Sequence, residues 1–202
     1  ILDGRVQLEI PGFEIGDGVH VGEGAEIHPD ARVEGPAVIG ENCRIEAGVR
    51  LGPYSVLGTN VRVRANTDLE RVVVHDNSYL GEGVRLRGTI IGRSCDLRNG
   101  VRGEEGVVLG DECFIGEQAV LGTGVKIYPF KTVETGAVIN SSIVWESRGS
   151  RSLFGRVGVS GLANVDVTPE LATRVAMAYG TSLKKDSTVI ISRDSSRSAR
   201  ML

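Results

Sequence analysis

Residues 15–69 read IGDGVHVGEGAEIHPDARVEGPAVIGENCRIEAGVRLGPYSVLGTNVRVRANTDL, and an aliphatic residue recurs in this stretch at every sixth position. These positions hold Ile15, Val21, Ile27, Val33, Ile39, Ile45, Leu51, Leu57, Val63 and Leu69. A second row, two residues before each next aliphatic, is small or compact: Val19, Ala25, Ala31, Ala37, Cys43, Val49, Ser55, Val61 and Thr67. A period of six fits neither an amphipathic helix nor an alternating strand, and it identifies a hexapeptide repeat.

A hexapeptide repeat predicts one short strand and one corner per repeat. Three repeats close a triangular coil of about 18 residues, and successive coils stack as parallel strands roughly 4.8 Å apart. The inward aliphatic side chains then pack into one continuous column, in which each coil contacts only its neighbours. The predicted fold class is therefore all-β, a parallel β-helix.

The repeat continues beyond Leu69 with two shifts of one residue. Val74, Leu80 and Leu86 come one residue early, and a second shift begins at Ile91. From there to Ile139 the sixth position stays aliphatic except at Gly103. We expect both shifts at corners, because surface loops tolerate deletions. The β-helix is predicted over residues 15–145, roughly seven coils of 18 residues.

The two flanks of the repeat differ in kind. Residues 1–14 alternate apolar and polar positions, and we interpret them as a lead-in strand or a partial coil closed by a Pro-Gly turn. Residues 146–152, ESRGSRS, are polar and predict a linker. The chain begins on Ile and opens with no targeting signal, so we expect it to be an interior piece of a longer polypeptide.

Residues 153–202 carry signals of an incomplete α/β segment. Thr168 is suited to cap a helix whose first position is Pro169, and apolar residues follow at helical spacing up to Leu183. TVIIS at Thr188–Ser192 predicts a short buried strand. About 50 residues are fewer than a domain usually needs to fold unaided, so the chain is expected to stop inside a domain.

Composition excludes several function classes. The net charge of -3 gives no general attraction to nucleic acid. No apolar run approaches the roughly 20 residues of a membrane span, and no signal peptide opens the chain, so we expect a cytoplasmic protein. The three cysteines, Cys43, Cys95 and Cys113, lack metal-ligand spacing and fall on small inward positions. We interpret them as small buried hydrophobic residues.

Four motifs in the repeat region carry a family resemblance: LEIPGFEI (8–15), VVVHDNSYLG (72–81), IYPFKTVETGA (127–137) and SSIVWESRG (141–149). They resemble the C-terminal left-handed β-helix of the sugar-phosphate nucleotidyltransferases, in particular the mannose-1-phosphate guanylyltransferases. Residues 153–202 resemble the opening of a phosphomannomutase-like domain. The resemblance implies left-handed coils and a non-catalytic scaffold that supports an upstream nucleotidyltransferase domain and mediates homo-oligomerisation. The enzyme would make GDP-mannose or a related nucleotide sugar.

The catalytic motifs of that family are not found in this sequence. Nucleotidyl transfer needs a Gly-rich loop that holds the triphosphate and acidic residues that hold Mg²⁺. The family places these in its N-terminal domain, and the GxG pairs of this chain fall on hexapeptide corners. We therefore assign no catalytic, cofactor or metal residue here. Mg²⁺ is expected only in the parent catalytic domain.

The mutase-like segment departs from its pattern. Active mutases have FGTSGxRG where residues 154–161 read FGRVGVSG, so a phosphate-contacting Thr-Ser pair and an Arg are replaced. A GRDTR-type turn becomes SRDSSR at residues 192–197. These differences predict a degenerate module.

An alternative function is a hexapeptide acyltransferase, in which a histidine acts as general base beside acyl-CoA. His75 is the best candidate, because it follows the inward Val74, points outward and adjoins Asp76. No orienting partner is identifiable for it, and His20 and His28 lie on other coils. Solvent-facing roles are favoured for all three. A purely structural solenoid that binds protein partners is a third hypothesis.

The arginines predict either a basic strip or a mixed surface. Arg44, Arg50 and Arg62 share the last position of their hexapeptides, and stacked arginines can contact phosphate. Further arginines follow at Arg64, Arg85, Arg87, Arg93, Arg98 and Arg102. Acidic residues are interleaved at Glu41, Glu46, Asp68, Glu70, Glu82 and Asp96. A mixed, solvated face is the favoured interpretation.

Overall fold

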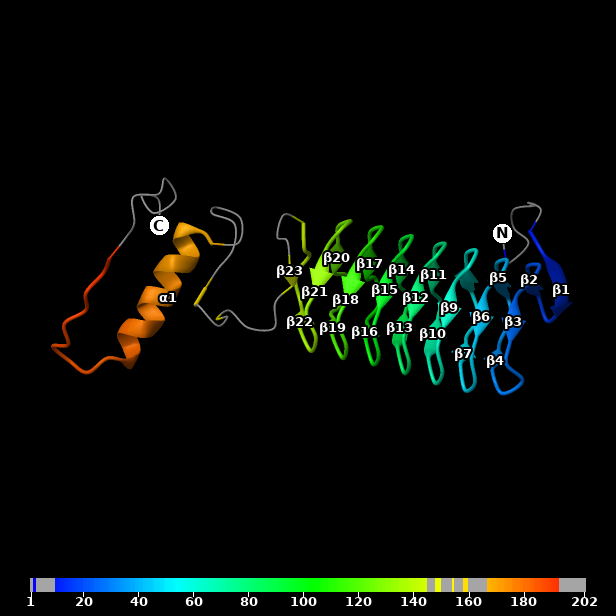
Figure 1. Cartoon of the computed structure of the whole chain (residues 1–202), viewed down its shortest axis with the longest axis horizontal. Coiled ribbons are helices and arrows are strands. Elements are labelled where there is room, and N and C mark those ends of the chain that lie inside the picture. Colours follow the sequence, from blue (N-terminus) through cyan, green and yellow to red (C-terminus); the bar gives the residue numbers. More distant parts are fainter. Residues whose placement is uncertain are drawn as a thin grey trace. The chain divides into compact units, whose positions relative to one another are not determined.

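The computed structural model describes residues 2, 10–144, 148–149, 154, 158–159 and 167–192. The chain divides into two units, Ile1–Arg151 and Ser152–Leu202. The first unit holds a parallel β-solenoid of about seven coils, as predicted (Figure 1).

Each coil contributes one strand to each of three sheets, which we call sheets A, B and C. Sheet A orders β1 (Phe13–Gly16), β2 (Val19–Val21), β5 (Ala37–Ile39), β8 (Ser55–Leu57), β11 (Val73–Val74), β14 (Ile90–Ile91), β17 (Val108–Leu109) and β20 (Lys126–Ile127). Sheet B orders β3 (Glu26–Ile27), β6 (Arg44–Ile45), β9 (Arg62–Val63), β12 (Tyr79–Leu80), β15 (Asp96–Leu97), β18 (Phe114–Ile115), β21 (Thr132–Val133) and β23 (Arg148–Gly149). Sheet C orders β4 (Arg32–Val33), β7 (Arg50–Leu51), β10 (Asp68–Glu70), β13 (Arg85–Arg87), β16 (Arg102–Gly103), β19 (Val120–Leu121) and β22 (Val138–Ile139).

The repeating aliphatic residues form the core. Their side chains stack in register from coil to coil, as where Ile39 of β5 lies beside Leu57 of β8. The largest side chains that are fully buried are Ile39, Ile45, Leu51, Leu57, Leu69, Leu80, Leu86, Ile91, Leu97, Leu109, Ile115 and Leu121. Backbone hydrogen bonds join the coils, for example from Arg44 N to Val61 O at 3.0 Å. The inward column predicted from the period of six is confirmed.

The two one-residue shifts lie at the same corner of the triangle, between sheet C and sheet A. One falls between Leu69 and Val74, where Arg71 has φ 53°, and the other between Leu86 and Ile91, where Gly88 has φ 53°. The interruption at Gly103 has a packing cause, since a Cβ there would lie 2.8 Å from Leu86 Cδ2. The shifts are absorbed at corners, as predicted.

The first repeat departs from the prediction. Ile15 is 65% exposed, and it belongs to β1, which pairs antiparallel with β2 instead of forming a coil strand. Placing Ile15 among the inward residues was therefore wrong. β1 runs along the edge of sheet A at its N-terminal end and supplies partners for backbone groups that an open coil would leave unpaired. The lead-in predicted before it lies largely outside the described residues.

In the second unit, α1 (Pro169–Ser182) begins as predicted, with Thr168 Oγ1 accepting a hydrogen bond from Leu171 N at 3.2 Å. The buried strand predicted at residues 188–192 is wrong. These residues form no strand, and Ile190 and Ile191 are each 91% exposed. Within the described residues no neighbouring strand pairs with them, so their apolar side chains have nothing to be buried against.

Two further observations concern the predicted linker and the helices. Arg148–Gly149, inside the predicted linker, form β23 and pair with β21. Among the residues that the structure describes, no helix combines the length and apolar character needed to cross a bilayer.

Candidate functional site

His75 lies at the corner that follows β11, and its side chain is exposed, as predicted. The adjacent Asp76 does not orient it, because Asp76 Oδ1 accepts a hydrogen bond from Thr59 N of the preceding coil at 2.8 Å. In the described part of the chain, the imidazole of His75 has no hydrogen-bond partner. A general base needs its ring held in one tautomer and direction, and that holding contact is not supplied here.

The structure does not bring the other histidines to His75. His28 follows β3, and its Nδ1 accepts a hydrogen bond from Asp30 N at 3.1 Å. His20 lies in β2 of sheet A, three coils before His75 along that sheet, and its Nδ1 is buried without a partner among the described residues. The three imidazoles therefore form no cluster.

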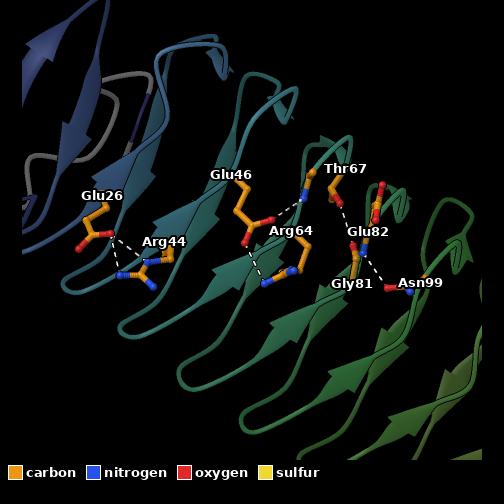
Figure 2. Close-up of polar contacts among 9 residues, drawn as sticks. Glu26, Arg44, Glu46, Arg64, Thr67, Gly81, Glu82 and Asn99 are labelled. Atoms are coloured by element: carbon orange, nitrogen blue, oxygen red, sulfur yellow. Dashed lines mark hydrogen bonds and ion pairs between the residues drawn. The ribbon is translucent and has the colours of Figure 1, made fainter.

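Six of the described arginines form ion pairs with carboxylates of the solenoid. Arg44 Nη2 lies 2.8 Å from Glu26 Oε2, and Arg64 Nη1 lies 2.9 Å from Glu46 Oε1. Both pairs are drawn in Figure 2. Further pairs are Arg50–Glu34 at 3.4 Å, Arg71–Glu105 at 2.7 Å, Arg87–Glu70 at 3.7 Å and Arg98–Asp96 at 3.0 Å. The interpretation of these arginines as part of a mixed, solvated face is confirmed.

Arg85 and Arg102 of sheet C are not paired in this way. They lie in register on β13 and β16, and neither guanidinium forms an ion pair or hydrogen bond in the described part of the chain. A shallow hollow of about 220 Å³ opens between them. Its lining residues are Asp68, Arg85, Leu86, Arg87, Arg102, Gly103 and Glu104. Two carboxylates line the same hollow, so an anion bound there would meet repulsion as well as attraction.

The cysteines occupy the interior, as predicted. Cys43, Cys95 and Cys113 are each 1% exposed, and each thiol donates a hydrogen bond to a carbonyl of the next coil, at 3.0, 3.1 and 3.2 Å. Burial raises the pKa of Cys43, and a hydrogen bond with Cys113, together with burial, raises the pKa of Cys95. Within the described segments no group of three or more metal-ligating side chains could hold an ion.

A set of contacts between coils was missed from the sequence. Asp76, Asn99 and Asp111 each accept a hydrogen bond from a backbone N–H of the preceding coil, at Thr59, Glu82 and Arg93 respectively. Figure 2 shows Glu82 N and Asn99 Oδ1, which are 3.0 Å apart. The sequence could have indicated these hydrogen bonds, because an Asp or Asn lies 17 or 18 positions after each donor. These side chains hold corners together and do not form a reaction site.

Comparison with known families follows the division of the chain. Residues 15–144, more than half of the sequence, match the family model of the GMPPB C-terminal domain. The chain belongs to the GMPPB C-terminal domain family. Beyond this GMPPB-type solenoid, residues 151–202 match the phosphoglucomutase/phosphomannomutase alpha/beta/alpha domain I. The resemblance of both regions noted in the sequence is thereby confirmed.

A curated relative matches a short part of the chain. Over 54 residues the sequence is 44% identical to a phosphoglucomutase/phosphomannomutase of Thermococcus kodakarensis (strain ATCC BAA-918 / JCM 12380 / KOD1). The match covers 25% of this chain and 12% of that relative, so this chain spans only a small fraction of its length.

Solved structures with a similar fold include acyltransferases. The UDP-N-acetylglucosamine acyltransferase of Francisella novicida superposes with a TM-score of 0.62 at 18% identity, covering 86% of this chain and 72% of that one. The Campylobacter jejuni UDP-N-acetylglucosamine acyltransferase superposes with a TM-score of 0.53 at 16% identity, covering 82% and 73%. At such identities the likeness concerns the fold alone.

Proposed function

We propose that this GMPPB-type solenoid is the non-catalytic β-helix region of a mannose-1-phosphate guanylyltransferase-like enzyme that makes GDP-mannose or a related nucleotide sugar. One observation carries the proposal: a solenoid that matches the GMPPB C-terminal domain is followed directly by a match to mutase domain I. The proposed role of the solenoid is to support an upstream nucleotidyltransferase domain and to mediate association between copies of the chain.

The upstream domain and the solenoid have different roles in this proposal. The upstream domain supplies the triphosphate loop and the carboxylates that hold Mg²⁺. The solenoid contributes a stiff support, because hydrogen bonds between coils run along all three sheets. The mutase-like segment is proposed to be degenerate, and its altered positions Arg156, Val157 and Ser160, like residues 193–197, lie outside the described residues. We place the protein in the cytoplasm, where nucleotide sugars and GTP are available.

An acyltransferase with His75 as base is the alternative, and it has weaker support. The similar acyltransferase structures support a shared fold only. His75 is exposed, and Asp76 is engaged with Thr59 N instead of with the imidazole.

The first test is the intact mass of the native polypeptide in its source cells. A mass several times that of the 202 residues, with a nucleotidyltransferase sequence upstream of Ile1, supports the proposal. A native polypeptide that consists of these residues alone contradicts it.

The second test separates the two reactions on that native polypeptide. We expect synthesis of GDP-mannose from GTP and mannose 1-phosphate, loss of this activity on chelation of Mg²⁺, and an unchanged rate in the His75→Ala variant. Calorimetric titration of the chain with acetyl-CoA should give no heat of binding. Saturable acetyl-CoA binding together with a His75-dependent acyl transfer would instead establish the alternative.

A further inference from the structure

The outward side chains of sheet A differ from those of the other two sheets. Along sheet A the row begins with Glu14 of the antiparallel β1, which lies opposite His20. From there the residue before each inward aliphatic is, in register, His20, Val38, Val56, Val73, Ile90, Val108 and Lys126. The same row of sheet B holds Glu26, Arg44, Arg62, Tyr79, Asp96, Phe114 and Thr132. In sheet C it holds Arg32, Arg50, Asp68, Arg85, Arg102, Val120 and Val138. We call the five aliphatic residues Val38, Val56, Val73, Ile90 and Val108 the apolar ladder.

Strand propensity does not explain the apolar ladder. Val and Ile favour strands, but that preference acts equally on the outward rows of sheets B and C, where four or more positions are charged. Ile90 is 44% exposed although its neighbours in the row flank it on both sides, and the other four residues are half-buried by one another. Five successive aliphatic side chains facing outward on one sheet alone indicate a surface that is covered by a partner.

The surroundings of the ladder permit close approach. On one side the residues that follow the inward aliphatics are Gly40, Gly58, His75, Gly92 and Gly110. On the other side the cation nearest its centre is Arg71, which is neutralised by the Glu105 carboxylate at 2.7 Å. The ladder therefore stands on a smooth surface, and a partner resting on it strips water from few charged groups.

We propose that a second copy of this chain docks on the apolar ladder, sheet A against sheet A, as a two-fold dimer with antiparallel solenoid axes. The proposal deepens the association role in the proposed function and rests on it. The side chains of the apolar ladder repeat roughly every 4.8 Å along the solenoid. A partner can contact each of them in turn only if its own side chains repeat at the same spacing, and another copy of the solenoid meets this requirement. In a two-fold arrangement the same patch serves both partners.

The charges at the two ends of the row select the antiparallel direction. Glu14 and His20 precede the ladder and Lys126 follows it. With antiparallel axes Val73 meets the partner's Val73, and Lys126 lies opposite the partner's His20, one strand away from the partner's Glu14. With parallel axes Lys126 would face the partner's Lys126, which is unfavourable.

The available area sets the strength of the dimer. Seven coils at roughly 4.8 Å and a strand-plus-corner width of roughly 15 Å give a face of about 500 Å² per copy. A total of about 1,000 Å² is at the lower limit for a specific interface, so we expect a dissociation constant on the order of micromolar.

Sedimentation equilibrium on the 202-residue chain tests the interface with a matched pair of variants. Val73→Glu places a carboxylate at the centre of the ladder, and Val120→Glu places one at the same outward slot of sheet C. We expect wild type and Val120→Glu to be dimeric at about 100 µM chain, and Val73→Glu to raise the dissociation constant by at least about 100-fold. Circular dichroism should show all three chains equally folded.

Three results of this experiment would contradict the proposed dimer. A wild-type chain that stays monomeric at about 100 µM, a trimer, or equal weakening by both variants overturns the proposal. None of these results affects the intact-mass test of the proposed function, which reads the length of the native polypeptide and not its association.

Cysteine cross-linking tests the direction. In the antiparallel dimer Val56 faces the partner's Ile90, so an oxidised mixture of Val56→Cys and Ile90→Cys chains should form a disulfide-linked dimer. Neither variant should cross-link efficiently by itself, and the native thiols are buried. Cross-linking of Val56→Cys chains to each other, without the second variant, would overturn the antiparallel arrangement.

Discussion

Arg71 and Glu105 form an ion pair across two coils, with Nη2 and Oε2 2.7 Å apart. Gly88 belongs to the intervening coil, and a Cβ at that position would overlap the Glu105 carboxylate. Arg71 and Gly88 are the left-handed residues of the two shortened corners, both with φ 53°. At these shortened corners the Glu105 carboxylate can therefore extend past Gly88 of the intervening coil and reach Arg71.

Replacing Gly88 by Ala should lower stability for two reasons. An alanine at φ 53° is strained, and its Cβ pushes the Glu105 carboxylate away from Arg71. We expect a loss of about 1–2 kcal/mol in the free energy of unfolding, measured by urea denaturation. Gly83→Ala is the control, because Gly83 has φ 66° and its Cβ would meet nothing within 4 Å. Equal losses in the two variants would show that the contact with Glu105 is immaterial.

The inward half of this fold is predictable from sequence because one physical requirement repeats. Each coil must bury one aliphatic side chain per face, so Leu69 and Val74 could be placed even across a shift. The prediction for Ile15 was wrong although Ile15 fits the period of six, because its strand β1 runs antiparallel to β2. The period of a sequence gives no information about the direction of a strand.

The outward half could be predicted less well. Asp76 was considered only as a partner for His75, its neighbour in sequence, whereas its hydrogen bond goes to Thr59 one coil away. The apolar ladder is equally non-local, because Val56, Val73 and Ile90 become a row only when the register across the two shortened corners is known. A structure supplies that register.

Asp76 and His75 should differ in what they contribute. Asp76 is half-buried and its carboxylate satisfies Thr59 N, so Asp76→Ala should cost about 1 kcal/mol of stability. Asp76→Asn retains an acceptor oxygen and should cost less. His75→Ala removes an exposed side chain and should change stability by no more than about 0.5 kcal/mol. Thermal unfolding of the three variants measures this order, and a destabilisation by His75→Ala as large as that by Asp76→Ala would contradict it.

Stability should fall in alkaline solution through the buried thiol of Cys43. Burial raises the pKa of Cys43 above its ordinary value of 9.0. The unfolded chain therefore loses this proton at a lower pH than the folded chain, and the free energy of unfolding should decline as pH rises past 9.0. Cys43→Ala is the comparison, since Ala37, Ala119 and Ala137 fill the same inward slot in other coils. Urea denaturation at a series of pH values should show a shallower alkaline decline in that variant, and an identical decline would contradict this account.

Phe130 occupies a backbone conformation that its side chain does not favour. It has φ 62° and is 72% exposed, while the equivalent corners of earlier coils hold Asn42, Asn60 and Asn77, at φ 54°, 57° and 58°. Asparagine tolerates this left-handed region better than a bulky residue does. Phe130→Asn should therefore raise the free energy of unfolding by about 0.5–1 kcal/mol, because little packing is lost with an exposed ring. The reverse change, Asn77→Phe, should lower it, and it also removes the hydrogen bond that Asn77 Oδ1 accepts from Asn60 Nδ2 at 2.9 Å. If Phe130→Asn instead destabilises the chain in urea denaturation, the exposed ring makes a stabilising contact that outweighs its backbone strain.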